Sequence, residues 1–408
     1  MRVVRARNRW FRPAAPPMPA VAEIIREVRD GGDEAVLSLT ERFDHAELGP
    51  EQLRVDAGEL EAAVGILEPD VLAGLRTAIT NVRSVARAQL PDEPVKVELP
   101  EGHSVEVVER PVQRAAVYVP SGRAPYPSTV VMGAVTARVA GVEQIVVCAP
   151  AGPAGRAQPV ILAACVLCEV SEVYRMGGAQ AIAALAYGTE SVRPVDVIVG
   201  PGNPYVQEAK RQVAFTQVGI DGVAGPSELV VVATSGANPE LVALDLIAQA
   251  EHGPDSPVWC LSPDDSVLDA VAAAIEARAY LPNAEAQLVQ TDGVRAALEL
   301  AEEIAPEHLE LIGEEAEALA GRVRNAGCLF VGAGAATAFG DYVAGSNHVL
   351  PTGGAARFQS ALSPATFRRR MARVSLPGEA PARLARAGAA LARAEGFPVH
   401  AESMERRA

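Results

Sequence analysis

The feature that most constrains the fold is a three-part repeat between residues 115 and 225: a short β-branched run, a Gly/Pro-rich loop and an Ala-rich stretch. The runs are 115–119 (AAVYV), 144–149 (QIVVCA), 172–175 and 195–199 (VDVIV). Runs of this kind that alternate with helices indicate parallel βαβ units covered on both faces. Because ligands of such sheets bind beyond the carboxyl ends of the strands, the loops at 120–122, 177–178 and 200–203 are candidate binding loops.

The same alternation resumes after this block. Strands are predicted at 229–233, 258–261 and 328–331, with helices at 239–252 and 267–279 between them. A chain of 408 residues also exceeds what one hydrophobic core usually supports. We therefore expect an α/β protein with two Rossmann-like domains, whose parallel-rich sheets are flanked by helices, plus small N- and C-terminal helical segments.

Outside these blocks the pattern is different. A helix is predicted at 20–30, ended by Gly31-Gly32, and a second helical region at 58–89. Apolar and polar residues alternate at 95–108 around a Pro-Glu-Gly turn, which predicts a β-hairpin. After Pro364 the chain is rich in Arg and Ala, which predicts helix.

Charge and cysteine usage exclude several classes of protein. A formal charge of -15 argues against binding nucleic acid or an anionic membrane, and no apolar run is long enough to span a bilayer. The N-terminus carries five arginines before its first acidic residue and lacks the apolar core of a secretory signal, so we expect an arm or a strip laid on a partner subunit. The five cysteines suit a reducing, cytoplasmic setting, and Cys165 and Cys168 suit core packing better than a redox or zinc role.

Two short segments carry residues suited to chemistry. Gln249 and His252 lie three apart on a predicted helix, so both project from one face and could supply two metal ligands, although a His that caps the last helical turn explains the segment more simply. Glu307 and His308 follow Pro306 and offer two adjacent proton-transfer groups of different basicity. A helix N-terminus with Pro in its first turn explains that segment equally well.

Two further candidates lie in irregular segments. Asp341 belongs to a Gly-rich stretch at 339–353, where charged residues are often functional. Glu395 and His400 lie on either side of Gly396 near the chain end, where a His is usually exposed and inert. Taken together, Gln249, His252, Asp341 and His400 offer two nitrogens and two oxygens, a set suited to Zn²⁺ or Mn²⁺.

The sequence contains neither G-x-G-x-x-G nor a P-loop, so its Gly-rich loops alone support a dinucleotide site only weakly. Its two lysines, Lys96 and Lys210, lie outside any pocket-like apolar context, which argues against Schiff-base chemistry.

Seven stretches in order resemble the histidinol dehydrogenase family over nearly the whole chain. They are YVPSGRAPYPSTVVM (118–132), GGAQAIAALAYGTESV (177–192), GPGNPYVQEAKRQV (200–213), GPSELVVVA (225–233), QAEHGPDS (249–256), APEHLEL (305–311) and GSNHVLPTGGAARFQS (345–360). Two positions depart from the family pattern: Ser121 replaces a usual Gly, and Gly133 replaces a usual polar residue.

The resemblance implies roles for individual residues. Gln249, His252, Asp341 and His400 would bind zinc, and Glu307 and His308 would form the catalytic pair. The zinc ligands would also hold the substrate, together with Ser227, His308 and Glu395. Tyr118, Gln180 and Asn203 would contact NAD.

The resemblance also implies a reaction and an assembly. L-histidinol would be oxidised to L-histidine through bound L-histidinaldehyde, with two NAD⁺ and one water. The family is a homodimer in which the C-terminal segment reaches across, so Glu395 and His400 would complete the site of the partner subunit. A zinc hydrolase, a solute-binding protein and a family member that acts on another amino alcohol are the alternatives.

Domain boundaries follow from the patterns and the resemblance together. We expect an N-terminal arm over residues 1–19 and a larger α/β domain made of 20–116 and 227–362, which would carry the zinc and catalytic residues. We expect a Rossmann-like NAD-binding domain over 117–226. A C-terminal helical segment over 363–408 would cross to the partner.

Overall fold

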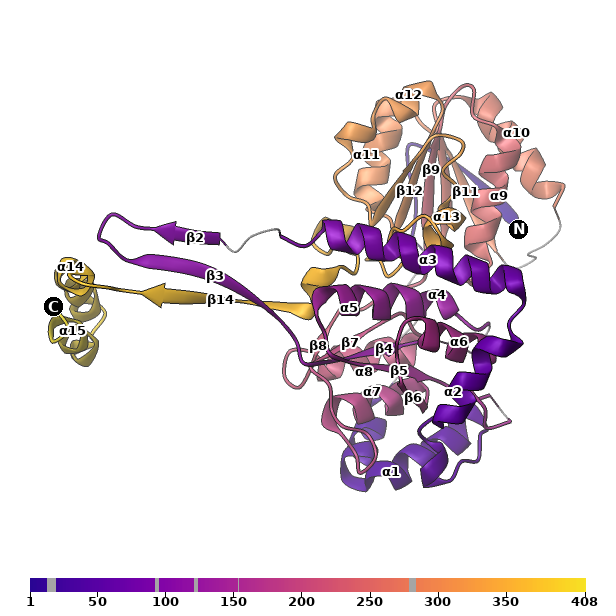
Figure 1. The fold of residues 1–408 in the computed structure, drawn as a ribbon. Coiled ribbons are helices and arrows are strands. Elements are labelled where there is room, and N and C mark those ends of the chain that lie inside the picture. Colours follow the sequence, from indigo (N-terminus) through magenta and orange to yellow (C-terminus); the bar gives the residue numbers. More distant parts are fainter. Residues whose placement is uncertain (13–19, 92–94, 121–123, 153, 279–283) are drawn as a thin grey trace. The chain divides into compact units, whose positions relative to one another are not determined.

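A computed structural model describes residues 1–12, 20–91, 95–120, 124–152, 154–278 and 284–408 (Figure 1). The chain divides into two compact units. The first consists of Met1–Gln89 and Gln113–Phe367, and the second of Leu90–Val112 and Arg368–Ala408. Among the described residues, no helix combines the length and apolar character needed to cross a bilayer.

The first unit contains a five-stranded parallel sheet in the order β6-β5-β4-β7-β8, which confirms the α/β repeats predicted between 115 and 225. Because the strand order reverses at β4, a crevice is expected beyond the carboxyl ends of β4 and β7. The strands are β4 (Arg114–Tyr118), β5 (Gln144–Ala149), β6 (Glu172–Arg175), β7 (Val197–Val199) and β8 (Gly219–Ile220).

Helices cover both faces of this sheet (Figure 1). On one face α1, α7 and α8 bury their apolar side chains against β4, β5 and β7 in one core cluster. On the other face, a Cβ at Gly133 would lie 2.6 Å from a Val117 methyl, so the close packing of η3 on β4 requires glycine at this position in this chain. Ser121 lies outside the described residues. The helical elements are α1 (Ala22–Asp44), α4 (Pro127–Val130), η3 (Val131–Val135), α5 (Thr136–Ala140), α6 (Pro159–Leu167), α7 (Gly178–Tyr187) and α8 (Pro204–Val213).

The helices before residue 90 follow the sequence predictions in part. The predicted stop at Gly31-Gly32 is confirmed as a break inside α1: Gly32 has a non-helical φ of 58°, which suits glycine, and a second helical segment follows, in which Val36 and Leu39 are buried against α7. The region 58–89 is interrupted where Pro69 begins α3. Helix α1 packs directly on the five-stranded sheet, whereas α2 and α3 pack on the helical elements α5, α6 and η3. The domain boundaries expected from the sequence stay predictions. The helical elements that follow α1 are η1 (Pro50–Gln52), α2 (Ala57–Ala63), η2 (Val64–Ile66) and α3 (Pro69–Ala88).

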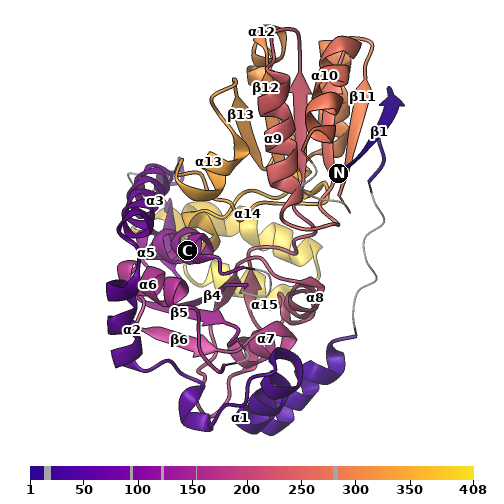
Figure 2. The ribbon, with the colours of Figure 1, turned by 90° about the vertical axis from the view of Figure 1, so that its right-hand side faces the viewer.

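A second, six-stranded parallel sheet lies in the same unit, in the order β1-β11-β10-β9-β12-β13 (Figure 2). Helices α9 and α10 pack on one face, and α11 and α12 on the other. The strands are β1 (Arg2–Arg7), β9 (Leu229–Ala233), β10 (Val258–Ser262), β11 (Glu285–Gln290), β12 (His308–Ile312) and β13 (Cys328–Val331). The helical elements are α9 (Pro239–Ala250), α10 (Asp265–Glu276), α11 (Val294–Ile304), α12 (Glu314–Glu317), η4 (Ala320–Arg322), α13 (Thr337–Tyr342), η5 (Ala355–Arg357) and η6 (Pro364–Phe367).

The N-terminal residues 2–7 form an edge strand rather than the expected arm. Strand β1 pairs in parallel with β11, and Val3 and Ala6 pack against the cores on opposite faces of the sheet. The arginines that suggested an arm instead form ion pairs with acidic residues of the neighbouring elements, as Arg5 does with Asp269. Residues 13–19 of the expected arm lie outside the described residues.

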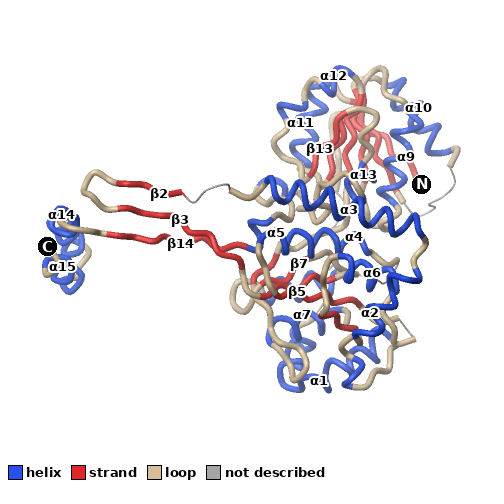
Figure 3. Tube along the Cα trace, in the orientation of Figure 1, coloured by secondary structure: helices blue, strands red, loops and turns tan. Residues whose placement is uncertain are grey.

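The second unit contains an antiparallel sheet in the order β14-β3-β2 and two helices (Figure 3). The predicted hairpin at 95–108 is confirmed as β2 (Val95–Glu98) and β3 (Ser104–Pro111). Strand β14 (Arg368–Ser375) was expected to be helical, but its arginines pair with acidic side chains of β3, as Arg370 does with Glu109. Helices α14 (Ala380–Ala394) and α15 (Pro398–Glu405) pack on each other through alanines.

Candidate active site

A cavity of about 1160 Å³ in the first unit gathers loops from both parallel sheets. Seven residues singled out from the sequence line it: Tyr118, Gln180, Asn203, Ser227, His252, Glu307 and Asp341. Gln249 and His308 lie just behind this lining and contact it through hydrogen bonds or close polar contacts. The Gly-rich loops and the polar residues singled out from the sequence therefore lie at the same cavity.

Glu307 is a buried carboxyl held by two direct hydrogen-bond donors. One of its oxygens accepts hydrogen bonds from the Ser227 hydroxyl and, at 3.0 Å, from the backbone N–H of Glu228. Ser227 in turn accepts a hydrogen bond of 2.7 Å from the Gln249 amide. Burial raises the pKa of Glu307 to about 8, so this carboxyl can exchange a proton near neutral pH.

His308 is the first residue of strand β12, so the alternative reading of 305–311 as a helix N-terminus is wrong. Burial lowers the pKa of His308 to about 4, and its imidazole is therefore neutral. Its Nδ1 lies 3.3 Å from the backbone oxygen of Glu228, which can only accept a hydrogen bond. Nδ1 thus carries the ring proton, and Nε2, which lies 3.7 Å from an Asp341 oxygen, has the lone pair that can take up a proton.

The predicted metal ligands of the first unit approach the same end of the cavity. Gln249 is 2% exposed, and its Oε1 is buried without a hydrogen-bond partner among the described residues. His252 follows α9, with Nδ1 3.2 Å from the Gln249 backbone oxygen, so it contacts the last helical turn as the capping alternative expected. That contact uses Nδ1 and is compatible with a ligand bond through Nε2.

A cation would satisfy the buried Gln249 oxygen, and the donor types fit zinc. Within the described residues, no three His, Cys, Asp or Glu side chains are gathered as in a complete metal site. Of the predicted set, only His252 and Asp341 are residues of these types in the first unit.

Glu395 and His400 belong to the second unit. Glu395 follows α14, and His400 is an exposed residue of α15 whose ring lies 5.2 Å from that of Phe397. Their predicted roles in substrate and zinc binding stay predictions.

The three residues expected to contact a dinucleotide lie at or beyond the carboxyl ends of β4, β6 and β7 in the same parallel sheet. Tyr118 ends β4, and its hydroxyl accepts a hydrogen bond of 3.2 Å from the Gly178 N–H. Gln180 lies in the first turn of α7, and its buried Nε2 has no hydrogen-bond partner among the described residues. Asn203 caps α8 by accepting a hydrogen bond of 3.1 Å from Val206. An unpartnered donor beside helix N-termini suits a polar ligand with phosphate groups.

Three further residues of this cavity had no role assigned to them from the sequence, although His348 belongs to the Gly-rich stretch that was considered functional. Lys210, contrary to the expectation for it, lines the cavity while only 1% exposed, donating to the Gly200 carbonyl and pairing with Asp221. Asp44 is the last residue of α1 and lines the cavity, and burial raises its pKa to about 6. His348 contacts the backbone oxygen of Asp341 at 2.8 Å.

Cysteine chemistry is poorly supported by the geometry. Cys328 is the register partner of His308 on the neighbouring strand β13, which the sequence did not reveal. Burial raises the pKa of its thiol, so it is protonated and a weak nucleophile. None of the five cysteines lines the cavity among the described residues.

Three comparisons with known proteins, by family model, by sequence and by structure, identify the same family. The family model described as histidinol dehydrogenase matches residues 14–408. The chain is 45% identical to histidinol dehydrogenase of Parasynechococcus marenigrum over 94% of this chain and 89% of the relative. It is 43% identical to that of Cereibacter sphaeroides over 95% of this chain and 91% of the relative. A crystal structure of histidinol dehydrogenase from Elizabethkingia anophelis is similar with a TM-score of 0.92 at 30% identity, covering 100% of this chain and 98% of that one.

Proposed function

This chain belongs to the histidinol dehydrogenase family, a family of oxidoreductases of histidine biosynthesis, and we propose that it oxidises L-histidinol to L-histidine through bound L-histidinaldehyde. The proposed reaction consumes two NAD⁺ and one water and depends on zinc. The observation that carries the proposal is the buried Glu307–His308 pair, whose pKa values are shifted in opposite directions at the end of a cavity lined by Gly-rich loops. Such a pair supplies both a base and an acid at one site.

His308 acts first in the proposed sequence. Its neutral imidazole takes the hydroxyl proton of the alcohol on Nε2, because Nδ1 is directed at the Glu228 carbonyl. When bound, NAD⁺ would accept the hydride in each oxidation. Tyr118, Gln180 and Asn203 would hold the cofactor at the carboxyl ends of the strands.

Glu307 acts on the aldehyde. Because its pKa of about 8 lies near the working pH, the ionised form of its carboxyl can take a proton from the water that attacks the aldehyde carbon and later release it to solvent. His308, after releasing its first proton to solvent, then accepts the hydroxyl proton of the hydrated aldehyde during the second oxidation. No cysteine is required, which agrees with the protonated state of Cys328.

Gln249, His252 and Asp341, together with His400 from the second chain of a dimer, would hold the zinc ion. A zinc ion there would fix and polarise the polar groups of the substrate. Ser227 and, from the second chain, Glu395 would contact the substrate as well. Ser227 suits this role because it already joins Gln249 to Glu307.

The substrate is tested by incubating the purified protein with NAD⁺ and L-histidinol, and separately with other L-amino alcohols. We expect L-histidine as the product, with kcat/KM for L-histidinol exceeding the others by at least about 10²-fold, since an unpaired buried ligand group is costly. Turnover without NAD⁺ would favour a hydrolase. Binding of L-histidinol without turnover would favour a solute-binding protein, and preference for another amino alcohol would change the substrate.

Lys210→Met should weaken cofactor binding. The ammonium group holds Gly200 through its carbonyl, and Asp221 accepts a hydrogen bond of 2.7 Å from the Gly200 N–H, so the cofactor loop depends on this pair. We expect KM for NAD⁺ to rise about tenfold, equivalent to about 1.4 kcal/mol, with little change in KM for L-histidinol. The matched control is Lys96→Met, which removes an exposed lysine of β2. Equal KM values in both variants would separate Lys210 from the cofactor loop.

The proposed sharing of sites between subunits predicts complementation. His400→Ala and His308→Asn chains, inactive alone, should regain activity after they are mixed, unfolded and refolded together. In a heterodimer one site would receive an intact His308 from one chain and an intact His400 from the other. Random pairing would give about half heterodimers, each with one intact site, so about a quarter of wild-type activity is expected. If the mixture stays inactive while size-exclusion chromatography shows dimers, each site is built within one chain.

A further inference from the structure

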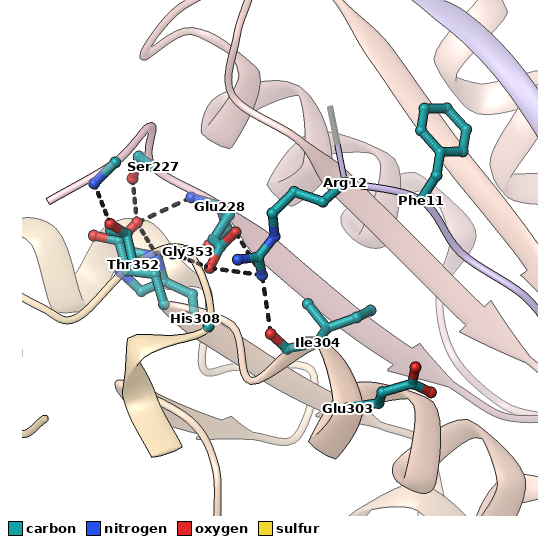
Figure 4. Close-up of polar contacts among 12 residues, drawn as sticks. Phe11, Arg12, Ser227, Glu228, Glu303, Ile304, His308, Thr352 and Gly353 are labelled. Carbon is teal, nitrogen blue, oxygen red and sulfur yellow. Dashed lines mark hydrogen bonds and ion pairs between the residues drawn. The ribbon is translucent and has the colours of Figure 1, made fainter. Parts of the chain in front are cut away.

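Glu228 lies directly behind the catalytic pair without lining the cavity. It is only 1% exposed, and its side chain extends toward the N-terminal segment (Figure 4). One carboxylate oxygen lies 3.2 Å from the Arg12 guanidinium, and the other accepts a hydrogen bond of 2.9 Å from the Gly353 N–H. The proposed reaction gives this buried ion pair no role.

The main chain of Glu228 contacts both members of the pair. Its N–H donates to the Glu307 carboxylate at 3.0 Å. Its carbonyl accepts from the His308 backbone N–H at 3.2 Å and lies 3.3 Å from Nδ1 of the same residue. A displacement of Glu228 would therefore change the position of the Glu307 carboxyl and remove the contact that places the proton on Nδ1 of His308.

Arg12 joins this residue to the segment that precedes the pair. The same terminal nitrogen that approaches Glu228 donates a hydrogen bond of 2.9 Å to the carbonyl of Ile304, the last residue of α11. Only Ala305 and Pro306 separate Ile304 from Glu307. The Arg12 guanidinium thus connects Glu228, the residue before β9, with the end of α11, which leads into β12. These two segments carry the contacts that position Glu307 and His308.

The preceding residues hold Arg12 in place. Trp10 packs edge-to-face on the buried Trp259, with ring centres 6.1 Å apart. The backbone of Phe11 forms two hydrogen bonds with the Gln287 side chain, of 3.1 and 2.7 Å. These contacts extend the attachment of β1 to the six-stranded sheet. They hold Arg12 next to Glu228, where its side chain is only 25% exposed.

We propose that Arg12 is a positioning residue for catalysis, whose guanidinium clamps Glu228 and the end of α11 so that Glu307 and His308 keep their reactive orientation. The inference rests on the proposed roles of Glu307 and His308. Its physical basis is that an unpaired buried carboxylate must take up a proton or turn toward water. Burial already raises the pKa of Glu228 to about 7 against the opposing effect of Arg12. Without Arg12, the ionised form of Glu228 would turn toward water and move the residue on which the pair depends, and the Ile304 carbonyl would lose its donor.

The test compares four variants in steady-state kinetics with L-histidinol and NAD⁺. Arg12→Ala should lower kcat about 10²-fold, the usual cost of a small misplacement of reacting groups, while KM for L-histidinol changes less than about threefold. Arg12→Lys should recover only part of the loss, because one ammonium group does not reproduce the planar fork of the guanidinium. Arg12→Ala/Glu228→Gln should be faster than Arg12→Ala, because a neutral amide needs no counter-charge. The matched control is Arg7→Ala, which loses only an exposed ion pair with Asp292.

Amide hydrogen exchange provides a readout that does not depend on turnover. In Arg12→Ala, peptides that cover 226–230 and 306–310 should exchange faster than in the wild type and in Arg7→Ala, while the five-stranded sheet is unchanged. An unchanged kcat, equal rates for Arg12→Ala and its double variant, or exchange that rises uniformly across the chain would overturn the inference. If the wild-type protein does not oxidise L-histidinol, the proposed function fails, and local exchange still decides whether Arg12 holds this region.

Discussion

Glu307→Gln should slow the conversion of L-histidinaldehyde to L-histidine by about 10²–10⁴-fold and leave the first oxidation much less affected. The amide keeps the shape of the side chain and can still accept the hydrogen bonds of Ser227 and Glu228, but it cannot take a proton from water. His308→Asn should slow both oxidations, because its imidazole is the proposed base in each. Single-turnover experiments that start separately from the alcohol and from the aldehyde distinguish the two steps.

The matched control for the carboxyl is Glu299→Gln, an exposed position on α11 in the segment before the pair. It should behave as the wild type in both steps. If Glu307→Gln retained both steps equally, Glu307 would lose its role as the base that activates water. If it abolished the first oxidation as strongly as the second, the carboxyl would act in both.

Removal of the metal should abolish turnover, with an expected loss of at least about 10³-fold, because it removes both the orientation and the polarisation of the substrate. Treatment with a chelator followed by its removal should give inactive protein, and stoichiometric Zn²⁺ should restore activity. His252→Ala should contain less zinc than the wild type by elemental analysis. The Gln249 side-chain oxygen supports this expectation, since it is buried with no hydrogen-bond partner among the described residues.

His45→Asn is the matched control for the metal experiment. His45 is an exposed residue with φ 54° after α1, a conformation that Asn tolerates well, and it should keep its zinc and its activity. Full activity in protein shown to be free of metal would remove zinc from the mechanism.

The sheets were predictable because their signal is local. Short β-branched runs such as 229–233 and 144–149 are buried on both faces, and their residue types alone indicate parallel strands. Strands β1 and β14 were missed because their arginines suggested an arm and a helix, respectively. Their acidic partners, such as Asp269 and Glu109, lie far away in the sequence.

The site was predictable only in part, because several of its residues contact partners that lie far away in the sequence. The residues around Glu307 and His308 are equally compatible with a catalytic pair and with a helix start. The occurrence of seven family motifs in the same order favoured the catalytic pair. The two ion pairs that support the site, Arg12–Glu228 and Lys210–Asp221, could not be predicted. Arg12 lies 216 residues from Glu228, and Lys210 meets Asp221 only once α8 and the loop after β8 are folded. A buried ion pair of this kind has no periodicity or motif in the sequence.

The most direct test of the account is the number of NADH molecules formed per molecule of L-histidinol. With limiting L-histidinol and excess NAD⁺, absorbance at the end of the reaction should correspond to two NADH per substrate, and L-histidine should account for the carbon. One NADH per substrate, with the aldehyde as the final product, would contradict the proposal that the Glu307–His308 pair carries both oxidations in one site.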